Sequence, residues 1–161
     1  SVKFAIKHHG YSGLRRSKMG TEEDDGTSPQ VVILDTIGEL GRLYSLADVV
    51  FVGGSFVKVG GHNILEPAAH GKPVIVGPYM FNFQEIFELL ESRGVCLMTK
   101  SEHEFKETLM DLLSHPDTMK RMGEAALTVV HENQGATERN IKAFEQLVAE
   151  AGVKLGGRHE S

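Results

Sequence analysis

Two glycine pairs in the middle of the chain constrain its fold more than any other feature. Gly53-Gly54 and Gly60-Gly61 enclose a short, mostly apolar segment. The preceding run, residues 47–52, is β-branched, aromatic and nearly uncharged, which predicts a buried strand. The following run, residues 63–70, opens with a polar residue and stops at Gly71-Lys72-Pro73, which predicts a helix. The chain therefore passes from a strand through a glycine-rich turn directly into a helix.

This order of elements is suited to binding a phosphate group. Glycines let the backbone approach a ligand closely, and the first N–H groups of a helix point at an anion placed there. Glu66 lies three residues after Asn63, where it could accept hydrogen bonds from sugar hydroxyls. The alternative is that the glycines only form a tight turn and that Asn63 and Glu66 cap the helix, worth about 1 kcal/mol. Spacing alone leaves both interpretations open.

Composition limits the class of protein. The 161 residues are 40% hydrophobic, enough for one compact domain with a sizeable core. The net charge of −5 argues against a nucleic-acid partner, since such proteins present a basic face. No apolar stretch approaches the ~20 residues of a membrane span and no signal peptide is visible, so a soluble domain is expected. The single cysteine, Cys96, lies in an apolar run and is expected to be a buried, inert thiol.

Short β-rich runs alternate with helical patterns along the chain. This alternation predicts an α/β fold, a Rossmann-like doubly wound parallel sheet flanked by helices. Residues 1–150 are expected to form one domain and residues 151–161 a flexible tail. The predicted strands are residues 2–7, 31–34, 48–52, 73–76 and 95–98, and residues 14–17 could add another. The predicted helices are 38–46, 63–70, 82–92, 102–113, 116–130 and 136–149, with breaks at Pro116 and Gly135.

In a doubly wound sheet, ligands bind beyond the carboxyl ends of the strands. That rule singles out the loops at residues 7–10, 35–39 and 53–63, which we expect to meet at one edge of the sheet. The second loop, taken alone, is better explained by an Asp35 or Thr36 cap with Gly38 easing the turn, and only the expected meeting of the three loops favours a ligand site.

Four segments between residues 35 and 83 closely resemble the 3-deoxy-D-manno-octulosonic acid (Kdo) transferases of lipopolysaccharide synthesis. A later segment, Asn133-Gln134-Gly135-Ala136-Thr137, is similar to a sequence found near the end of these enzymes. The resemblance extends over residues 31–150. Its four segments read DTIGELGRLY (35–44), ADVVFVGGS (47–55), GGHNILEPAAH (60–70) and PVIVGPYMFNF (73–83).

The resemblance implies the C-terminal, donor-binding half of a two-domain GT-B glycosyltransferase. Such enzymes transfer Kdo from CMP-Kdo to a lipid A precursor, with inversion and without a metal or other cofactor. The catalytic base is a glutamate of the N-terminal half, so no catalytic residue is expected in this chain. The acceptor site and the membrane contact would also lie in that missing half, at the cytoplasmic face of the bacterial inner membrane. The isolated domain is expected to bind nucleotide without catalysing transfer.

Carried over by position, the resemblance assigns ligand contacts to both later loops. The turn at residues 37–40 would contact the CMP moiety, Asn63 would hold the phosphate and Glu66 the ribose. Ser55, Gly61 and His62 would line the same pocket. The full set of expected substrate-binding residues is Lys7, Ile37, Gly38, Glu39, Leu40, Ser55, Gly61, His62, Asn63 and Glu66.

The segment after the first predicted strand departs from the family pattern. Kdo transferases carry Arg-His-Pro-x-Arg there, whereas this chain reads Lys7-His8-His9-Gly10-Tyr11. Lys7 is the candidate cation for the leaving phosphate, although a lysine offers a point charge rather than a bidentate fork. His8 and His9 are interpreted as loop histidines rather than metal ligands, because neighbours on a strand point to opposite faces.

Three other functions remain as alternatives. The chain could be the donor domain of another GT-B enzyme or a sugar-nucleotide epimerase that uses UDP-sugars, in which case it would prefer UMP to CMP. It could be a non-catalytic module that senses a nucleotide. In the third alternative the glycine loops are only turns, and no nucleotide binds.

Overall fold

The structure is a computed structural model that describes residues 10–21, 26 and 28–150, with residues 134–150 described by their backbone alone. The chain divides into two compact units, residues 1–46 and 47–161. The predicted strand at residues 2–7, the residues Lys7, His8 and His9, and the predicted tail at 151–161 lie outside the described residues.

The first unit contains a pair of parallel strands. Strand β1 (Gly13–Arg15) pairs with β2 (Val31–Ile33), with Leu14 opposite Val32. A short 3-10 helix, η1 (Arg16–Lys18), follows β1, and helix α2 (Leu40–Leu46) ends the unit. The prediction placed the start of α2 at Gly38, which was wrong by two residues. Gly38 has φ +86°, a conformation that a right-handed helix cannot include.

The second unit is built on a three-stranded parallel sheet in the order β3-β4-β5. These strands are Val50–Phe51, Val74–Val76 and Cys96–Met98. All of β4 is buried, as expected for a central parallel strand covered on both faces. The prediction of parallel strands alternating with helices is confirmed.

The described part of the second unit also contains five helices: α3 (Leu65–Ala69), the 3-10 helix η2 (Phe81–Phe83), α4 (Gln84–Ser92), α5 (Glu102–Ser114) and α6 (Pro116–Glu150). The predicted break at Pro116 is confirmed, because α5 ends at Ser114 and Pro116 opens the next helix. The predicted break at Gly135 was wrong, since α6 continues through it. A glycine inside a helix costs only about 1 kcal/mol relative to alanine, which a long helix tolerates.

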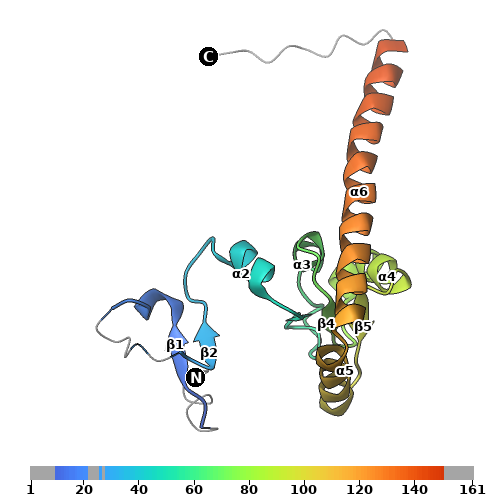
Figure 1. The fold of residues 1–161 in the computed structure, drawn as a ribbon. Helices are drawn as coiled ribbons and strands as arrows, with labels where there is room; N and C mark the ends of the chain where they lie inside the picture. The colour runs from blue at the N-terminus through green and yellow to red at the C-terminus, as the bar shows by residue number, and fades with distance from the viewer. Residues whose placement is uncertain (1–9, 22–25, 27, 151–161) are drawn as a thin grey trace. The chain divides into compact units, whose positions relative to one another are not determined.

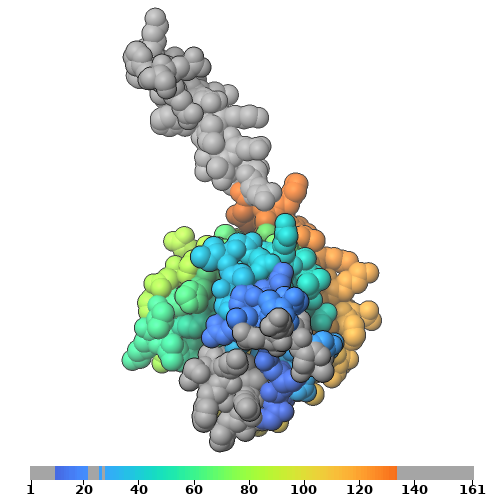
Figure 2. Space-filling view, turned by 90° about the vertical axis from the view of Figure 1, so that its left-hand side faces the viewer, coloured from blue at the N-terminus to red at the C-terminus, as the bar shows by residue number. Residues whose placement is uncertain are grey.

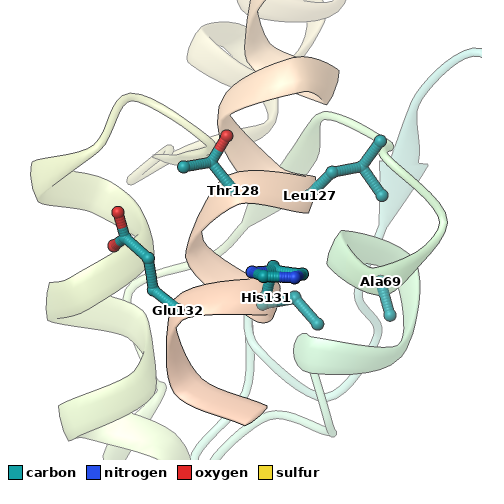
Figure 3. Close-up of a pocket in the computed structure, with 6 residues that line it drawn as sticks. Ala69, Leu127, Thr128, His131 and Glu132 are labelled. Atoms are coloured by element: carbon teal, nitrogen blue, oxygen red, sulfur yellow. The ribbon is translucent and has the colours of Figure 1, made fainter. Parts of the chain in front are cut away.

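Two hydrophobic clusters hold helices against opposite faces of this sheet. The larger one joins Val74 and Val76 of β4 to α3, α4 and α6. Helix α6 lies between α3 and α4 in both views of this region (Figure 1, Figure 3). The smaller cluster joins Ile75, which points to the other face, to Leu112 of α5 and Met122 of α6. The second unit is therefore a three-layer α/β arrangement.

The loop after β3 and the segment from η2 into α4 lie side by side. They form a continuous green to yellow-green surface in the space-filling view (Figure 2), and the side chain of Asn82 bonds to the carbonyl of Val59. Both segments follow a parallel strand, so they mark the carboxyl edge of the sheet. Among the described helices, none is both long enough and apolar enough to cross a membrane.

Candidate functional site

The glycine-rich loop at residues 53–63 is fastened to the sheet through Ser55. The Ser55 side chain is fully buried; its hydroxyl donates to the Val52 carbonyl at 2.5 Å and accepts from the Gly77 N–H at 2.8 Å. The Ser55 carbonyl accepts a further bond from the N–H of Tyr79 at 2.9 Å. Ser55 therefore fixes the glycine loop to the backbone segments that follow β3 and β4. Its predicted contact with a ligand stays a prediction.

The second glycine pair is packed against the segment after β4. Gly60 and Gly61 have φ angles of +99° and +75° and are buried. A Cβ atom on Gly60 would lie 2.6 Å from Phe81 Cε2 and 2.6 Å from Asn82 Cγ, so a side chain there has no room. A Cβ atom on Gly61 would similarly overlap the Met80 side chain. The glycines are thus required for close packing as well as for turning the chain.

The residues directly after this turn offer free backbone donors. His62 and Asn63 are exposed, and no described residue accepts a hydrogen bond from the main-chain N–H of either one. The His62 ring lies over Gly54, where a Cβ atom would be 3.3 Å from its Nε2. Two consecutive unpaired N–H groups at an exposed loop can bind an anionic oxygen.

Asn63 and Glu66 are joined to each other. The Asn63 amide donates to Glu66 Oε1 at 3.2 Å, and Asn63 Oδ1 accepts from the N–H of Leu65, the first residue of α3, at 3.0 Å. The helix begins two residues later than predicted, because Asn63 turns the chain before it. The bond from the Leu65 N–H agrees with the capping interpretation in part, but the N-cap position itself is Ile64, which makes no side-chain bond. The exposed Glu66 carboxylate is also able to accept from a sugar hydroxyl.

The loop at residues 35–40 belongs to the first unit and is held by the segment after β1. Asp35 accepts from the Ser17 N–H at 3.0 Å, from the Ser17 hydroxyl at 2.8 Å and from Arg15 Nη1 at 3.1 Å. The two bonds from Ser17, with the Arg15 guanidinium, lower the pKa of Asp35 to about 2. Asp35 consequently joins two loop segments and does not cap α2.

Glu39 is anchored within the same unit. Its carboxylate accepts from the Thr36 hydroxyl and from Arg16 Nη2, the latter at 3.0 Å. The Thr36 hydrogen bond, followed by the charge of Arg16, lowers the pKa of Glu39, so the group is ionised at neutral pH. The structure thus gives Glu39 a fixed position and no sign of a proton-transfer role.

The neighbours of Glu39 present an open surface. The Ile37 side chain is fully exposed, Leu40 is half exposed, and nothing lies within 4 Å of a Cβ atom built on Gly38. Such a turn can offer backbone groups and an apolar side chain to a planar ligand. Because this loop and the loop at residues 53–63 belong to different units, their meeting at one site stays a prediction.

A shallow cavity of about 650 Å³ lies elsewhere, between α6 and the C-terminal end of α3. Figure 3 shows Leu127 and His131 of α6 on the side that faces Ala69. Of the predicted ligand-binding residues, Gly61, His62 and Asn63 instead precede the N-terminal end of α3, and Glu66 lies in its first turn. A smaller cavity of about 280 Å³ is lined by residues 81–86, beside the glycine loop.

The other reactive groups among the described residues give no second site. Cys96 is buried, and burial, with a smaller effect of the Glu91 charge, raises the pKa of its thiol to about 12, which confirms the prediction of an inert cysteine. Within the part of the chain that the structure describes, no three His, Cys, Asp or Glu side chains are grouped to hold a metal ion.

Sequence reasoning missed the residues that support the glycine loop from the segment after β4. Gly77 contacts the Ser55 backbone so closely that a Cβ atom would lie 2.6 Å from the Ser55 carbonyl carbon. Asn82 bonds to the loop through both its side chain and its backbone. One sequence signal was present, since Asn82 is a polar residue between two phenylalanines in the segment that follows β4, on the edge of the sheet where ligands bind.

Known proteins are similar to this chain in sequence and in fold. Two relatives are 3-deoxy-D-manno-octulosonic acid transferases, from Haemophilus influenzae (40% identity, 83% of this chain) and Bordetella pertussis (37% identity, 84% of this chain). The fold is similar to the crystal structure of the C-terminal CMP-Kdo binding domain of WaaA from Acinetobacter baumannii. That similarity has a TM-score of 0.70 at 31% identity and covers 80% of this chain and 66% of the other.

These matches cover most of this chain but only part of each relative. The chain spans 31% of the length of each of the two transferases. Residues 21–129, more than half of the chain, match the family described as Glycosyl transferases group 1. The chain therefore belongs to the glycosyl transferases group 1 family.

Proposed function

We propose that this chain is the donor-binding domain of a Kdo transferase and that its ligand is CMP-Kdo. The observation that carries the proposal is its likeness, in sequence and in fold, to a domain described as binding CMP-Kdo. The named transferases among its relatives support the same assignment. The exposed loop of free N–H groups at the carboxyl edge of the sheet gives the proposal a physical basis.

The free N–H groups of His62 and Asn63 would bind the phosphate of the donor. Helix α3 has only five residues, so its dipole adds little, and the individual N–H groups must supply the attraction. Gly61 would let the backbone come close to the phosphate. Ser55 would contribute by fixing the loop, because its own hydroxyl is buried.

The remaining contacts would surround the nucleoside. Glu66 would accept hydrogen bonds from the ribose hydroxyls, with Asn63 holding its carboxylate in place. Backbone groups of Ile37, Gly38 and Leu40 would contact the cytosine, with Glu39 fixed by Arg16 and Thr36. Lys7 would neutralise part of the phosphate charge as CMP leaves.

We further propose the setting of the reaction. Transfer would proceed with inversion and without a metal, and an N-terminal half would supply the catalytic glutamate and bind the lipid A precursor. That half would also contact the cytoplasmic face of the inner membrane. On this account the present chain binds the donor and does not catalyse transfer alone.

Calorimetric titration with CMP and with UMP tests the proposed ligand. We expect CMP to bind about tenfold more tightly than UMP, a difference of ~1.4 kcal/mol, because the two pyrimidines present different hydrogen-bonding edges. Tighter binding of UMP would instead indicate an enzyme that uses UDP-sugars. Absence of binding by either nucleotide would contradict the proposal for this chain.

A glutamate variant tests the ribose contact. Glu66→Ala should weaken CMP binding about tenfold, since a hydrogen bond to a charged group contributes roughly 1.5–3 kcal/mol. Glu88→Ala is the matched control, because Glu88 is an exposed helical glutamate that also bonds to a neighbouring amide, that of Gln84. Equal affinities for the two variants would remove Glu66 from the site.

A further inference from the structure

We propose that Asn82 is a positioning residue for the glycine loop, acting on a ligand through the backbone of residues 59–63. Its two hydrogen bonds fix the Gly60–Gly61 turn and so fix the direction of the free N–H groups of His62 and Asn63. The inference rests on the proposed function, in which those groups hold the donor phosphate.

Asn82 binds the loop at two consecutive carbonyl groups. Its side-chain amide donates to the Val59 carbonyl at 3.0 Å, and its main-chain N–H donates to the Gly60 carbonyl at 3.3 Å. These carbonyls belong to the residue before the turn and to the first residue of the turn. Rotation of either peptide group would reorient the N–H groups that follow, so Asn82 restrains the rotation that matters for binding.

The close fit of Asn82 against Gly60 restricts the turn further. A Cβ atom on Gly60 would lie 2.6 Å from Asn82 Cγ and would overlap the amide nitrogen. Both glycines adopt positive φ angles, where the backbone has alternatives of similar energy if nothing holds it. The contact with Asn82 selects one of these conformations.

The segment that carries Asn82 is itself fixed by burial and by backbone hydrogen bonds. Met80, two residues earlier, is 1% exposed, and its carbonyl accepts from the Phe83 N–H at 2.8 Å. The Tyr79 N–H bonds to the Ser55 carbonyl at 2.9 Å. The segment from Tyr79 to Phe83 is therefore hydrogen-bonded to the glycine loop near its start, at Ser55, and near its end, at Val59 and Gly60. An anion site whose donors are fixed before binding loses less entropy when it binds.

The test compares two Asn82 variants with a matched asparagine elsewhere. Asn82→Leu keeps the approximate volume and removes the donor, and Asn82→Ala removes both. Asn133→Ala is the control, since Asn133 also donates its side-chain amide to a backbone carbonyl, that of Val129 at 2.8 Å. We expect both Asn82 variants to bind CMP at least about tenfold more weakly and the control to bind within about twofold of the parent chain. Unchanged CMP affinity in Asn82→Leu would overturn the proposal.

Hydrogen exchange provides a readout that needs no ligand. The Gly61 N–H donates to the Gly54 carbonyl at 3.3 Å, so its exchange rate reports how often the turn opens. It should exchange about tenfold faster in Asn82→Leu and at the parent rate in Asn133→Ala. An unchanged Gly61 rate in Asn82→Leu would overturn the positioning role. If the parent chain fails to bind CMP, the proposed function fails, and this exchange measurement alone decides the role of Asn82. If Asn82→Ala does not fold, Asn82→Leu carries both measurements.

Discussion

At the scale of single residues, the buried hydroxyl of Ser55 joins two strands of the chain that are far apart in sequence. It bonds to Val52, directly after β3, and to Gly77, directly after β4. Its environment explains why a serine stands in this apolar region: the two backbone groups would otherwise be buried without partners.

Ser55→Ala should therefore destabilise the protein by about 1–3 kcal/mol, because it leaves a buried N–H and a buried carbonyl unsatisfied. Urea denaturation measures the change in the free energy of unfolding. Ser92→Ala, which removes an exposed hydroxyl bonded to the Leu89 carbonyl, should change it by less than about 0.5 kcal/mol. An equal decrease in the free energy of unfolding in the two variants would show that the buried hydrogen bonds of Ser55 contribute no more stability than the exposed bond of Ser92.

The charge of Asp35 predicts a dependence of stability on pH. Its pKa falls from 3.8 to about 2 on folding, so the folded state favours the ionised carboxylate. This stabilisation is present above about pH 4 and is lost as the pH falls toward 2. Asp35→Asn should reduce the loss of thermal stability between pH 4 and pH 2, measured by melting at each pH. Asp48→Asn, at an exposed aspartate, is the control, and an Asp35→Asn profile that matches it would contradict this account.

The pairing of Asn63 with Glu66 shows how far residue-level prediction reaches. Their spacing of three residues correctly indicated a local interaction, and the structure contains it. The spacing did not indicate that Ser55 would be buried, because a serine after a glycine pair reads as a surface turn residue. Burial depends on Gly77 and Tyr79, which are brought in by the sheet.

At the scale of elements, α6 packs against the turn after α3 through a contact between two glycines, Gly123 and Gly71. A Cβ atom on Gly123 would overlap the carbonyl oxygen of Gly71 and lie 3.2 Å from its carbonyl carbon. The helix can approach the turn after α3 this closely because Gly123 lacks a side chain, whereas a Cβ atom on Gly71 would make a tight contact at 3.3 Å with Leu127. Gly71 also has φ +66°, which ends α3 in a left-handed turn.

Gly123→Ala should destabilise the protein by about 1–3 kcal/mol, since the added methyl group must push the helix away from the turn. Alanine usually favours a helix over glycine by up to about 1 kcal/mol, so the expected sign is the reverse of the intrinsic preference. Gly41→Ala in α2 is the matched control, because nothing lies within 4 Å of a Cβ atom there, and it should be neutral or stabilising. A stabilised Gly123→Ala variant in chemical denaturation would disprove the close contact.

The ends of a helix were predicted closely where the sequence offers residues that start and stop a helix, as it does for α5. Helix α5 begins at its predicted residue and extends one residue past its predicted end. The hydroxyl of Ser101, which was not predicted as a cap, caps it by accepting from the Glu104 N–H. Helix α6 was predicted as two helices because Gly135 follows a polar run. The structure shows one helix, since a single glycine lowers helix stability without forbidding it.

At the scale of the whole molecule, the alternation of β-rich and helical runs was sufficient to predict parallel α/β architecture. The order β3-β4-β5 and the fully buried β4 confirm it. What the sequence could not supply was the partner of the glycine loop. Gly60 and Asn82 are in contact although a helix and a strand separate them along the chain. Such a long-range contact produces no periodic pattern in the sequence from which it could be predicted.

The measurement that tests the donor-site account most directly is a titration with CMP followed by backbone amide chemical shifts. We expect the largest shifts at His62, Asn63 and the neighbouring residues 60–66, with a second group at residues 37–40. Such a map would join the two loops in one nucleotide site. Shifts confined to the cavity beside Ala69 and His131, or none in residues 60–66 at saturating CMP, would contradict the account.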